Sequence, residues 1–508
     1  MPTNVGIVFN FFQLPDVLNY PFVISKRSDG VVVKKGLFVY TNSIEGYLIG
    51  IIEKIILLNE YFSDALTIKA YNNENNPNIL KGLFPSDDFE YAIAVVKNLG
   101  IIHFKDKEHM VIDKVSRMTY PVSPGKEVYL VEDNLLTDFL GLNPTTGLEL
   151  GKIKVSNLNA DIDMDRLLNK HFAILSISGG GKSYLTSIII EELISRNKNC
   201  GTPAVILIDV HGEYTYMKKV TQIKDKIKII DTNYFQIAVP QLNAYSYQKY
   251  QEQISNVQIR ELSKYLKNIR KTNLNNKGYS LSDLVDFIEK DENGNKSTKQ
   301  ALIGWLAELD HLKLFGPQEN PILKNVVTNG ELTIFNLQNE ISIRKKQIIV
   351  DYICNRLFYL RRKNEIPPFL IIIEEAHQFS PEAAHSKALS KSIIETIARE
   401  GRKFMACLCL ISQRPKKLST TALSQANSKM ILNIKNPYDL KHLMDSSENI
   451  TKDYAKMISN LAVGEMLLMG SAINYPIFIE IRTRKFKSDL ENISLSQVCT
   501  QWKNVNSN

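Results

Sequence analysis

Short apolar stretches separated by turn residues recur along the first quarter of the chain. They cover residues 5–12, 30–40, 47–58, 89–104 and 127–131. Such spacing is typical of several short strands in one β-rich domain, and a barrel is a common way to close them. We therefore predict a small barrel-like domain over residues 1–145, with at least one helix mixed into it.

A second pattern begins after a Gly- and Pro-bearing stretch at 141–147, where we place the domain boundary. Uninterrupted apolar runs that indicate buried strands cover residues 171–175, 204–208, 332–337, 369–373, 406–411 and 430–434. Between the first two runs, Leu185, Ile188 and Leu193 recur at helical spacing within a helix expected over residues 182–195. Strands that alternate with helices predict an α/β fold with a doubly wound, largely parallel sheet over residues 146–490.

Residues 244–312 interrupt this alternation with a helical and polar pattern. Apolar residues at helix intervals are Tyr247, Tyr250, Ile254, Ile259, Leu262 and Leu266. Turn-rich polar segments at 273–278 and 291–296 divide the pattern into separate helices. We predict a helical insertion at about 244–330, and we expect residues 491–508 to form a C-terminal tail.

The first buried strand of this second domain runs into a glycine-rich turn that precedes the expected helix. The turn ends with Gly179, Gly180, Gly181, Lys182 and Ser183. Glycines let backbone N–H groups wrap phosphate oxygens, a lysine reaches the β- and γ-phosphates, and a hydroxyl holds Mg²⁺. The N-terminus of the following helix also favours an anion. The segment therefore predicts a P-loop that binds ATP and Mg²⁺.

Two neighbours of this turn belong to the predicted nucleotide site. Ser176 occupies the position of the first glycine in G-x-x-x-x-G-K-[ST], so a serine must tolerate that backbone geometry. Tyr184 follows Ser183 at the start of the helix. A glycine-rich turn with a chance Lys-Ser pair is the simpler alternative, and the strand and helix that flank the turn argue against it.

An acidic pair, Glu374 and Glu375, ends the apolar run at 369–373. Sheets of this class bind ligands at the carboxyl ends of their strands. We expect Glu374 to hold Mg²⁺ through water, a role usually taken by aspartate, and Glu375 to polarise the attacking water. The alternative is a pair of acids that favours a helix dipole. We expect His211 and His377, also near strand ends, to have structural roles.

Three further polar clusters follow strands or helices that we expect to approach the same crevice. Asp209 and Glu213 follow the second strand of the domain, and Gln413 follows the strand at 406–411. An amide such as that of Gln413 can sense the γ-phosphate. Arg399 and Arg402 end a helix and are candidates for an arginine finger, which stabilises transition-state charge and is often supplied by a neighbouring subunit.

Composition and charge narrow the class of protein. The 508 residues are 44% hydrophobic and 23% charged, which indicates globular domains, and no apolar run approaches the roughly 18 residues of a membrane span. The five scattered cysteines indicate no disulfide framework, and Cys407 and Cys409 are expected inside a buried strand. We therefore expect a cytoplasmic protein without a membrane anchor. The net charge of +8 permits an anionic partner without requiring one.

The chain resembles the HerA family, in the FtsK–HerA branch of P-loop ATPases. The resemblance lies in four segments that follow one another in this order: the glycine turn, residues 209–214, residues 374–377, and the run 399–404 leading to 412–415. The β-rich N-terminal segment is similar to the small barrel of that family. The resemblance implies a RecA-type ATPase core in a hexameric ring, with ATP between subunits and double-stranded DNA through the centre. It also implies an effector partner, either a NurA-like nuclease in DNA end processing or a nuclease or sirtuin-type protein in anti-phage defence.

The resemblance also implies roles for residues already singled out. The Walker residues would be Lys182, Ser183, Glu374 and Glu375. Asp209 and Glu213 would line the nucleotide or Mg²⁺ region, and Arg399 or Arg402 would act on a neighbouring subunit. Ser176, and a glutamate at the position of Glu374, depart from the usual pattern.

Two functions are compatible with such a site. The first is a translocase that couples hydrolysis to movement along duplex DNA. The second is an ATPase scaffold that assembles and regulates a defence effector without translocating. The basic runs at 416–417 and 482–485 would contact DNA phosphates in the first case and be solvated surface charge in the second. A conjugation or segregation motor fits less well without membrane segments, and a GTPase lacks its Asn-Lys-x-Asp motif.

Overall fold

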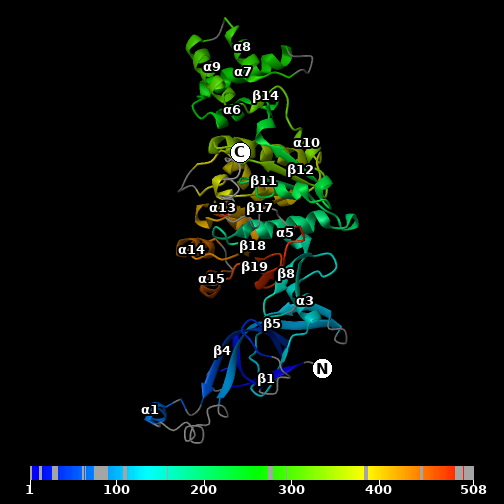
Figure 1. Ribbon diagram of the computed structural model, residues 1–508, viewed down its shortest axis with the longest axis vertical. Helices are drawn as coiled ribbons and strands as arrows, with labels where there is room; N and C mark the ends of the chain where they lie inside the picture. Colours follow the sequence, from blue (N-terminus) through cyan, green and yellow to red (C-terminus); the bar gives the residue numbers. More distant parts are fainter. Residues whose placement is uncertain are drawn as a thin grey trace. The chain divides into compact units, whose positions relative to one another are not determined.

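The computed structural model divides the chain into two compact units (Figure 1). Met1–Pro144 and Lys152–Ala160 form the first unit, and Thr145–Gly151 and Asp161–Asn508 form the second. The structure describes residues 3–10, 14–25, 32–59, 62, 64–73, 90–106, 111–156, 158–272, 278–292, 295–382, 387–446, 450–486 and 496. The expected tail at 491–508, apart from residue 496, lies outside this description, as do parts of the expected stretches at 5–12, 30–40 and 89–104 and of the breaks at 273–278 and 291–296.

The first unit is a closed barrel. Its strands are β1 (Asn4–Val8), β2 (Asn19–Ile24), β3 (Phe38–Ser43), β4 (Gly46–Asn59), β5 (Glu90–Asp106), β6 (Val111–Ser116) and β7 (Glu127–Leu130). They are ordered β2-β1-β7-β3-β4-β5-β6, and pairing of β5 back to β2 closes the ring with β6 outside it. Tyr20, Phe22 and Leu48 are fully buried inside. With helices α1 (Ala65–Asn73) and α3 (Asp133–Leu140), the unit confirms the β-rich, barrel-like prediction.

The second unit is built on an 11-stranded sheet. Its strands are β8 (Leu148–Ile153), β9 (Asn159–Ile162), β10 (His171–Leu175), β11 (Ala204–Asp209), β12 (Ile227–Asp231), β15 (Leu332–Asn336), β16 (Phe369–Ile373), β17 (Ala406–Ser412), β18 (Ala426–Ile431), β19 (Glu465–Gly470) and β20 (Ile477–Ile481). The order is β12-β15-β11-β16-β17-β10-β18-β19-β20-β8-β9. The strands from β12 to β18 are parallel, and β19 and β20 are antiparallel.

This sheet confirms the predicted doubly wound α/β fold. The helices that connect its strands are α5 (Lys182–Ser195), α11 (Ile343–Arg362), α12 (Lys391–Glu400) and α13 (Thr420–Gln425). The connection from β10 to β11 moves along the sheet toward β12. The connections from β15 to β16, from β16 to β17 and from β17 to β18 move the opposite way. Because such crossovers are right-handed, α5 covers one face of the sheet, and α11, α12 and α13, which pack against one another, cover the other.

The helical insertion lies between the short strands β13 (Ile237–Ala238) and β14 (Phe315–Gly316). It contains α6 (Ala244–Tyr250), α7 (Asn256–Thr272), α8 (Leu281–Glu289) and α9 (Lys296–Asp310), which gather together in Figure 1. The ammonium of Lys249 in α6 lies 2.5 Å from the buried carboxylate of Asp351 in α11. The insertion is therefore tied to a helix that covers the main sheet.

The remaining elements are short. The helices are α4 (Met164–Leu168), α10 (Leu323–Val326), α14 (Pro437–Asp445) and α15 (Lys452–Ser459). The 3-10 turns are η2 (Lys198–Cys200), η3 (Thr215–Lys219), η4 (Lys224–Lys226), η5 (Thr232–Tyr234), η6 (Val239–Gln241), η7 (Ala376–Gln378), η8 (Gly401–Phe404) and η9 (Pro415–Lys417). Among the described segments, no helix is both long and apolar enough to cross a membrane.

The basic run at 482–485 is bound to the second unit itself. The guanidinium of Arg482 lies 3.2 Å from Glu191 and 2.7 Å from Glu192, both in α5. Glu191 is fully buried and also accepts the backbone N–H groups of Lys485 and Phe486. Arg482 therefore neutralises a buried carboxylate, and the expectation that this residue contacts DNA phosphates does not fit its position.

Replacing Arg482 by methionine should lower the free energy of unfolding by about 3–5 kcal/mol, because the buried Glu191 would lose its partner charge. Lys485→Met is the matched control, since that side chain is half exposed and its ion pair should contribute roughly 0–1 kcal/mol. Urea titration of both variants measures the difference. Equal losses would show that Glu191 does not depend on Arg482.

Candidate functional site

The glycine turn between β10 and α5 has a backbone that needs its glycines. Gly179 and Gly181 have φ angles of +72° and +95°, in the left-handed region that glycine adopts without strain. A Cβ atom on Gly180 would lie 2.0 Å from the hydroxyl oxygen of Ser176. Each of the three glycines is therefore required by the local conformation, and the N–H of Gly180 closes the turn by donating to the carbonyl of Ile177 at 3.2 Å.

Ser176 fits its position without strain, although it replaces the first glycine of the usual pattern. Its backbone φ is not positive, and its side chain is buried. Its hydroxyl donates to the carbonyl of Ile177 at 3.1 Å. Its backbone N–H donates to the carbonyl of Ser412 at 3.3 Å, which fixes the start of the turn to the end of β17.

The residues that begin α5 follow directly. The ammonium of Lys182 donates to the carbonyl of Ile177 across the turn at 3.4 Å. Tyr184 is covered on one face by the guanidinium of Arg484, 4.2 Å from the ring centre, and its hydroxyl accepts the backbone N–H of Arg484 at 2.9 Å. Nothing local in the sequence indicates this neighbour, because Arg484 lies 300 residues further along.

Two buried carboxylates lie side by side at the ends of β11 and β16. Ile208 pairs with Ile373, so Asp209 and Glu374 extend from adjacent strands. Asp209 accepts the N–H groups of Gly212, Glu213 and Tyr214 at 2.7 to 3.1 Å and thereby shapes the turn that follows β11. Burial raises the pKa of Asp209, although these N–H groups oppose the rise.

Glu374 is held from both sides. One carboxylate oxygen accepts the hydroxyl of Tyr214 and the other accepts the N–H of Val210, each at 3.2 Å. Burial, followed by the charges of Asp209 and Glu213, raises the pKa of Glu374 well above its usual range. Two like charges on adjacent buried strand ends repel each other even with these donors, and a cation between the carboxylates and the glycine turn would relieve the repulsion.

The donor chemistry of this edge suits Mg²⁺. The ion prefers oxygen ligands and is usually bound through one or two carboxylates together with substrate phosphates and water. Glu374 and the hydroxyl of Ser183 offer such oxygens. Within the ranges that the structure describes, no group of three or more His, Cys, Asp or Glu side chains is arranged around a metal position.

Glu375 has an unusual backbone. Its φ and ψ of 45° and 42° lie in the left-handed region, which costs about 1–2 kcal/mol for a residue with a side chain. Burial raises the pKa of its carboxyl, whereas Lys182 and a hydrogen bond from Gln413 oppose that rise. The carboxylate oxygen Oε2 is buried and meets no well-aligned hydrogen-bond donor among the described residues. The strain and this orphaned oxygen suit a reactive group rather than a structural one.

Both histidines that we interpreted as structural approach Glu375. The ring nitrogen Nδ1 of His377 lies 3.2 Å from its carboxylate, and His211 is exposed but close enough to lower the pKa of Glu375. A signal was present in the sequence, since each histidine lies two residues after a strand-end acid, Asp209 or Glu375. A purely structural role does not account for this approach to Glu375.

Arg399 and Arg402 lie at the other edge of the sheet. The turn after α12 is next to the first residues of the strands, because Gly401 approaches the ring of His171 and the carbonyl of Met405 accepts the N–H of Phe369. The glycine turn follows the opposite end of β10, a strand length of roughly 16 Å away. The expectation that this cluster shares a crevice with the P-loop of the same chain is wrong. The parallel strands all end at one edge of the sheet, where the P-loop lies, whereas the helices that connect them end at the opposite edge, where the arginines lie.

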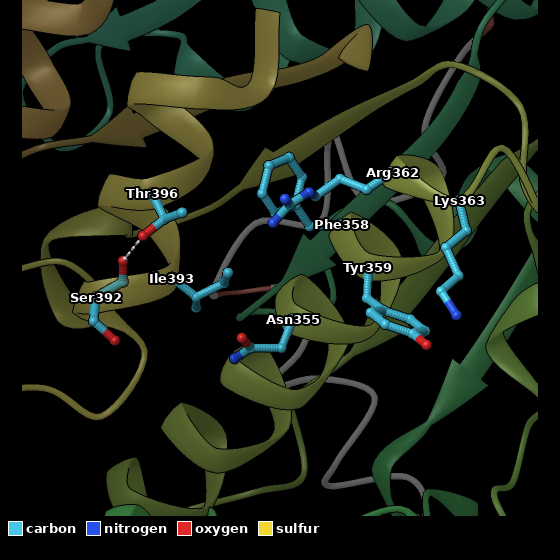
Figure 2. Close-up of a pocket in the computed structure, with 8 residues that line it drawn as sticks. All are labelled: Asn355, Phe358, Tyr359, Arg362, Lys363, Ser392, Ile393 and Thr396. Atoms are coloured by element: carbon cyan, nitrogen blue, oxygen red, sulfur yellow. Dashed lines mark hydrogen bonds between the residues drawn. The ribbon is translucent and has the colours of Figure 1, made fainter. Parts of the chain in front are cut away.

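A separate cavity of about 630 Å³ lies between α11 and α12 (Figure 2). It is lined by Asn355, Phe358, Tyr359, Arg362, Lys363, Ser392, Ile393 and Thr396. The guanidinium of Arg362 is already stacked 5.3 Å from the ring of Phe404, and the ammonium of Lys363 lies 4.7 Å from the ring of Tyr359. None of the predicted site residues lines this cavity, so the glycine turn and the acids remain the candidate site.

Cys407 and Cys409 are buried in β17 and free of disulfides, as expected. Burial raises the pKa of both thiols, so they remain protonated and apolar in character. They contribute to the core of the sheet and not to the site.

Comparison with known proteins finds relatives that match this arrangement. Residues 148–357 match the family described as "Helicase HerA, central domain". The chain is 27% identical over 534 aligned positions to a probable helicase of Methanocaldococcus jannaschii, covering 95% of this chain and 96% of the relative. It is 26% identical to the DNA double-strand break repair helicase HerA of Pyrococcus furiosus, covering 91% of this chain and 90% of that protein.

A solved structure agrees on the fold. VirB4 of Thermoanaerobacter pseudethanolicus superposes with a TM-score of 0.54 at 15% identity, covering 68% of this chain and 98% of VirB4. With the glycine turn, the strand-end acids and the parallel sheet described above, these comparisons lead to one conclusion: residues 148–357 match the HerA central domain, and the chain is similar over most of its length to HerA helicases.

Proposed function

We propose that this protein hydrolyses ATP with Mg²⁺ to drive movement along double-stranded DNA. The observation that carries the proposal is the convergence of the glycine turn, the buried acids and Gln413 at one edge of the sheet. The DNA substrate is supported by relatives that are named as DNA double-strand break repair helicases and that match most of this chain.

Each residue at this edge has a proposed role. Gly179, Gly180 and Gly181 shape the turn that wraps the phosphates, and Lys182 binds the β- and γ-phosphates. Ser183 and Glu374 hold Mg²⁺, which when bound offsets phosphate charge. Asp209 and Glu213 shape the neighbouring turn. Ser176 and Tyr184 border the nucleotide.

The hydrolytic step is proposed to run through Glu375. Its carboxylate orients a water molecule for in-line attack on the γ-phosphorus and accepts a proton as the new P–O bond forms. The bond to the β-phosphate oxygen breaks, and ADP and phosphate are released. Gln413 hydrogen-bonds to Glu375. We propose that it senses the γ-phosphate and couples its presence to the position of the Glu375 carboxylate.

We further propose a ring, as a hexamer, with an arginine from one protomer acting on the nucleotide of the next. The support is the position of Arg399 and Arg402, which are exposed at the sheet edge opposite their own glycine turn. A nuclease or another defence effector is the proposed partner, in DNA end processing or anti-phage defence, within the cytoplasm. The number of six protomers, the partner and the cytoplasmic location rest on the family resemblance alone.

Linear duplex DNA should stimulate ATP hydrolysis by the purified protein several-fold. The stimulation should fall steeply as salt is raised, because phosphate contacts release counterions. Lys182→Ala, measured in parallel, should show no hydrolysis with or without DNA. If the wild type hydrolyses ATP at the same rate in both conditions, translocation is excluded for the isolated protein and the scaffold function is favoured instead.

A further inference from the structure

We propose that His377 is a positioning residue that holds the Glu375 carboxylate in its hydrolytic orientation and, through Ser412, links it to the glycine turn. The inference rests on the proposed role of Glu375 and extends it to two residues outside the usual P-loop set.

The contacts are short and largely shielded from solvent. Nδ1 of His377 lies 3.1 Å from the hydroxyl oxygen of Ser412 and 3.2 Å from Oε2 of Glu375. The side chains of His377 and Glu375 are only 10% and 6% exposed. Among the described residues, no donor, the imidazole included, reaches Oε2 with good hydrogen-bond geometry. The imidazole therefore restrains this oxygen by a close electrostatic contact and not by an aligned hydrogen bond.

The protonation of the imidazole suits this role. Burial, together with Arg414, Lys417 and Lys182, lowers the pKa of His377 to about 4, so the ring is neutral near pH 7. A neutral ring carries one N–H, and the tautomer with hydrogen on Nδ1 makes both contacts favourable, because the carboxylate and the hydroxyl oxygen both accept. The N–H then donates to Ser412, and the same nitrogen lies 3.2 Å from the reactive carboxylate.

Ser412 connects this pair to the nucleotide-binding turn. Its hydroxyl oxygen also accepts the N–H of Arg414 at 3.0 Å, which fixes its rotamer. Its carbonyl accepts the N–H of Ser176, the first residue of the turn, at 3.3 Å. A displacement of the turn on nucleotide binding would therefore reach Glu375 through Ser412 and His377, in addition to any path through Gln413.

The strain at Glu375 explains why a restraint is needed. A residue in the left-handed region persists only where surrounding contacts over-determine it. The glutamate side chain has three rotatable bonds, so the backbone alone cannot fix its carboxylate. Misplacement of a reacting group by about 1 Å can cost roughly 100-fold in rate. His377 and Gln413 approach the carboxylate from η7 and from the end of β17.

The test compares two substitutions of similar size. His377→Leu fills the space without a donor, whereas His377→Asn places an amide N–H close to the original Nδ1. For the leucine variant, kcat should fall about 10- to 100-fold with the Kd for ATP unchanged. The asparagine variant should recover most of that loss. Ser412→Ala should reduce kcat less than His377→Leu, since the direct contact to Glu375 remains.

The outcomes separate this inference from the proposed function. If the wild type hydrolyses ATP and the leucine variant keeps its kcat, only the positioning role is refuted. Equal losses in the leucine and asparagine variants, accompanied by equal drops in melting temperature, would also refute it, because both would then reflect folding. If the wild type hydrolyses no ATP under any condition, the proposed hydrolytic function itself fails.

Discussion

Glu375→Gln is expected to bind ATP as tightly as the wild type and to hydrolyse it about 10²- to 10⁴-fold more slowly, the usual loss when a general base is removed. Glutamine keeps the shape and the hydrogen bond to Gln413 but cannot accept a proton. Single-turnover hydrolysis measures the chemical step, and titration with a fluorescent ATP analogue measures affinity. An unchanged rate would remove Glu375 from the mechanism.

Stability provides the control for this experiment. The residue Glu375 is 5% exposed, and burial raises the pKa of its carboxyl group, so the charged form is unfavourable there. A neutral amide removes that desolvation cost, and the melting temperature of Glu375→Gln should be equal to or higher than that of the wild type. A loss of activity without a loss of stability would then be chemical. Lys182→Ala should instead weaken ATP binding itself.

Much of the sheet could be predicted because its central strands are buried on both faces. The strands at His171–Leu175 and Phe369–Ile373 and the helix at Lys182–Ser195 have the bounds expected from the sequence. The edge strand Ile227–Asp231 was not predicted, since its solvent-facing lysine and partly buried residues break the apolar run. β18 begins at Ala426 instead of residue 430, because small and polar residues pair with β10 there.

The candidate site could be predicted in part for a topological reason. Residues that follow parallel strands lie at the same edge of the sheet. The positions of Asp209, Glu374 and Glu375 at strand ends were therefore enough to predict that they belong to one site, without any measured distance between them. Contacts between distant segments had no such signal. The pairing of Arg482 with α5 and the approach of His377 to Ser412 depend on how loops fold back, which local patterns do not encode.

Removing the correct arginine finger should lower kcat by about 10³- to 10⁵-fold without weakening ATP binding. Arg399, in the last turn of α12, and Arg402, just after that helix, are both exposed at the edge of the sheet opposite their own glycine turn. Within one protomer neither can reach the γ-phosphate across a strand length of roughly 16 Å. Arg399→Ala and Arg402→Ala, compared with each other, should show the full loss for one residue and a small change for the other.

Mixing variants tests whether that arginine acts between protomers. A Lys182→Ala protomer cannot bind ATP productively but keeps its arginine, and the arginine variant has the reverse defect. In a mixed ring, some sites combine an intact Lys182 with an intact arginine from the neighbour, so activity should return although each variant alone is inactive. Mixing two preparations of the arginine variant is the matched control and should restore nothing. An inactive mixture, with mixed assembly confirmed by native mass spectrometry, would place the arginine and the nucleotide in the same protomer, which the geometry of the sheet opposes.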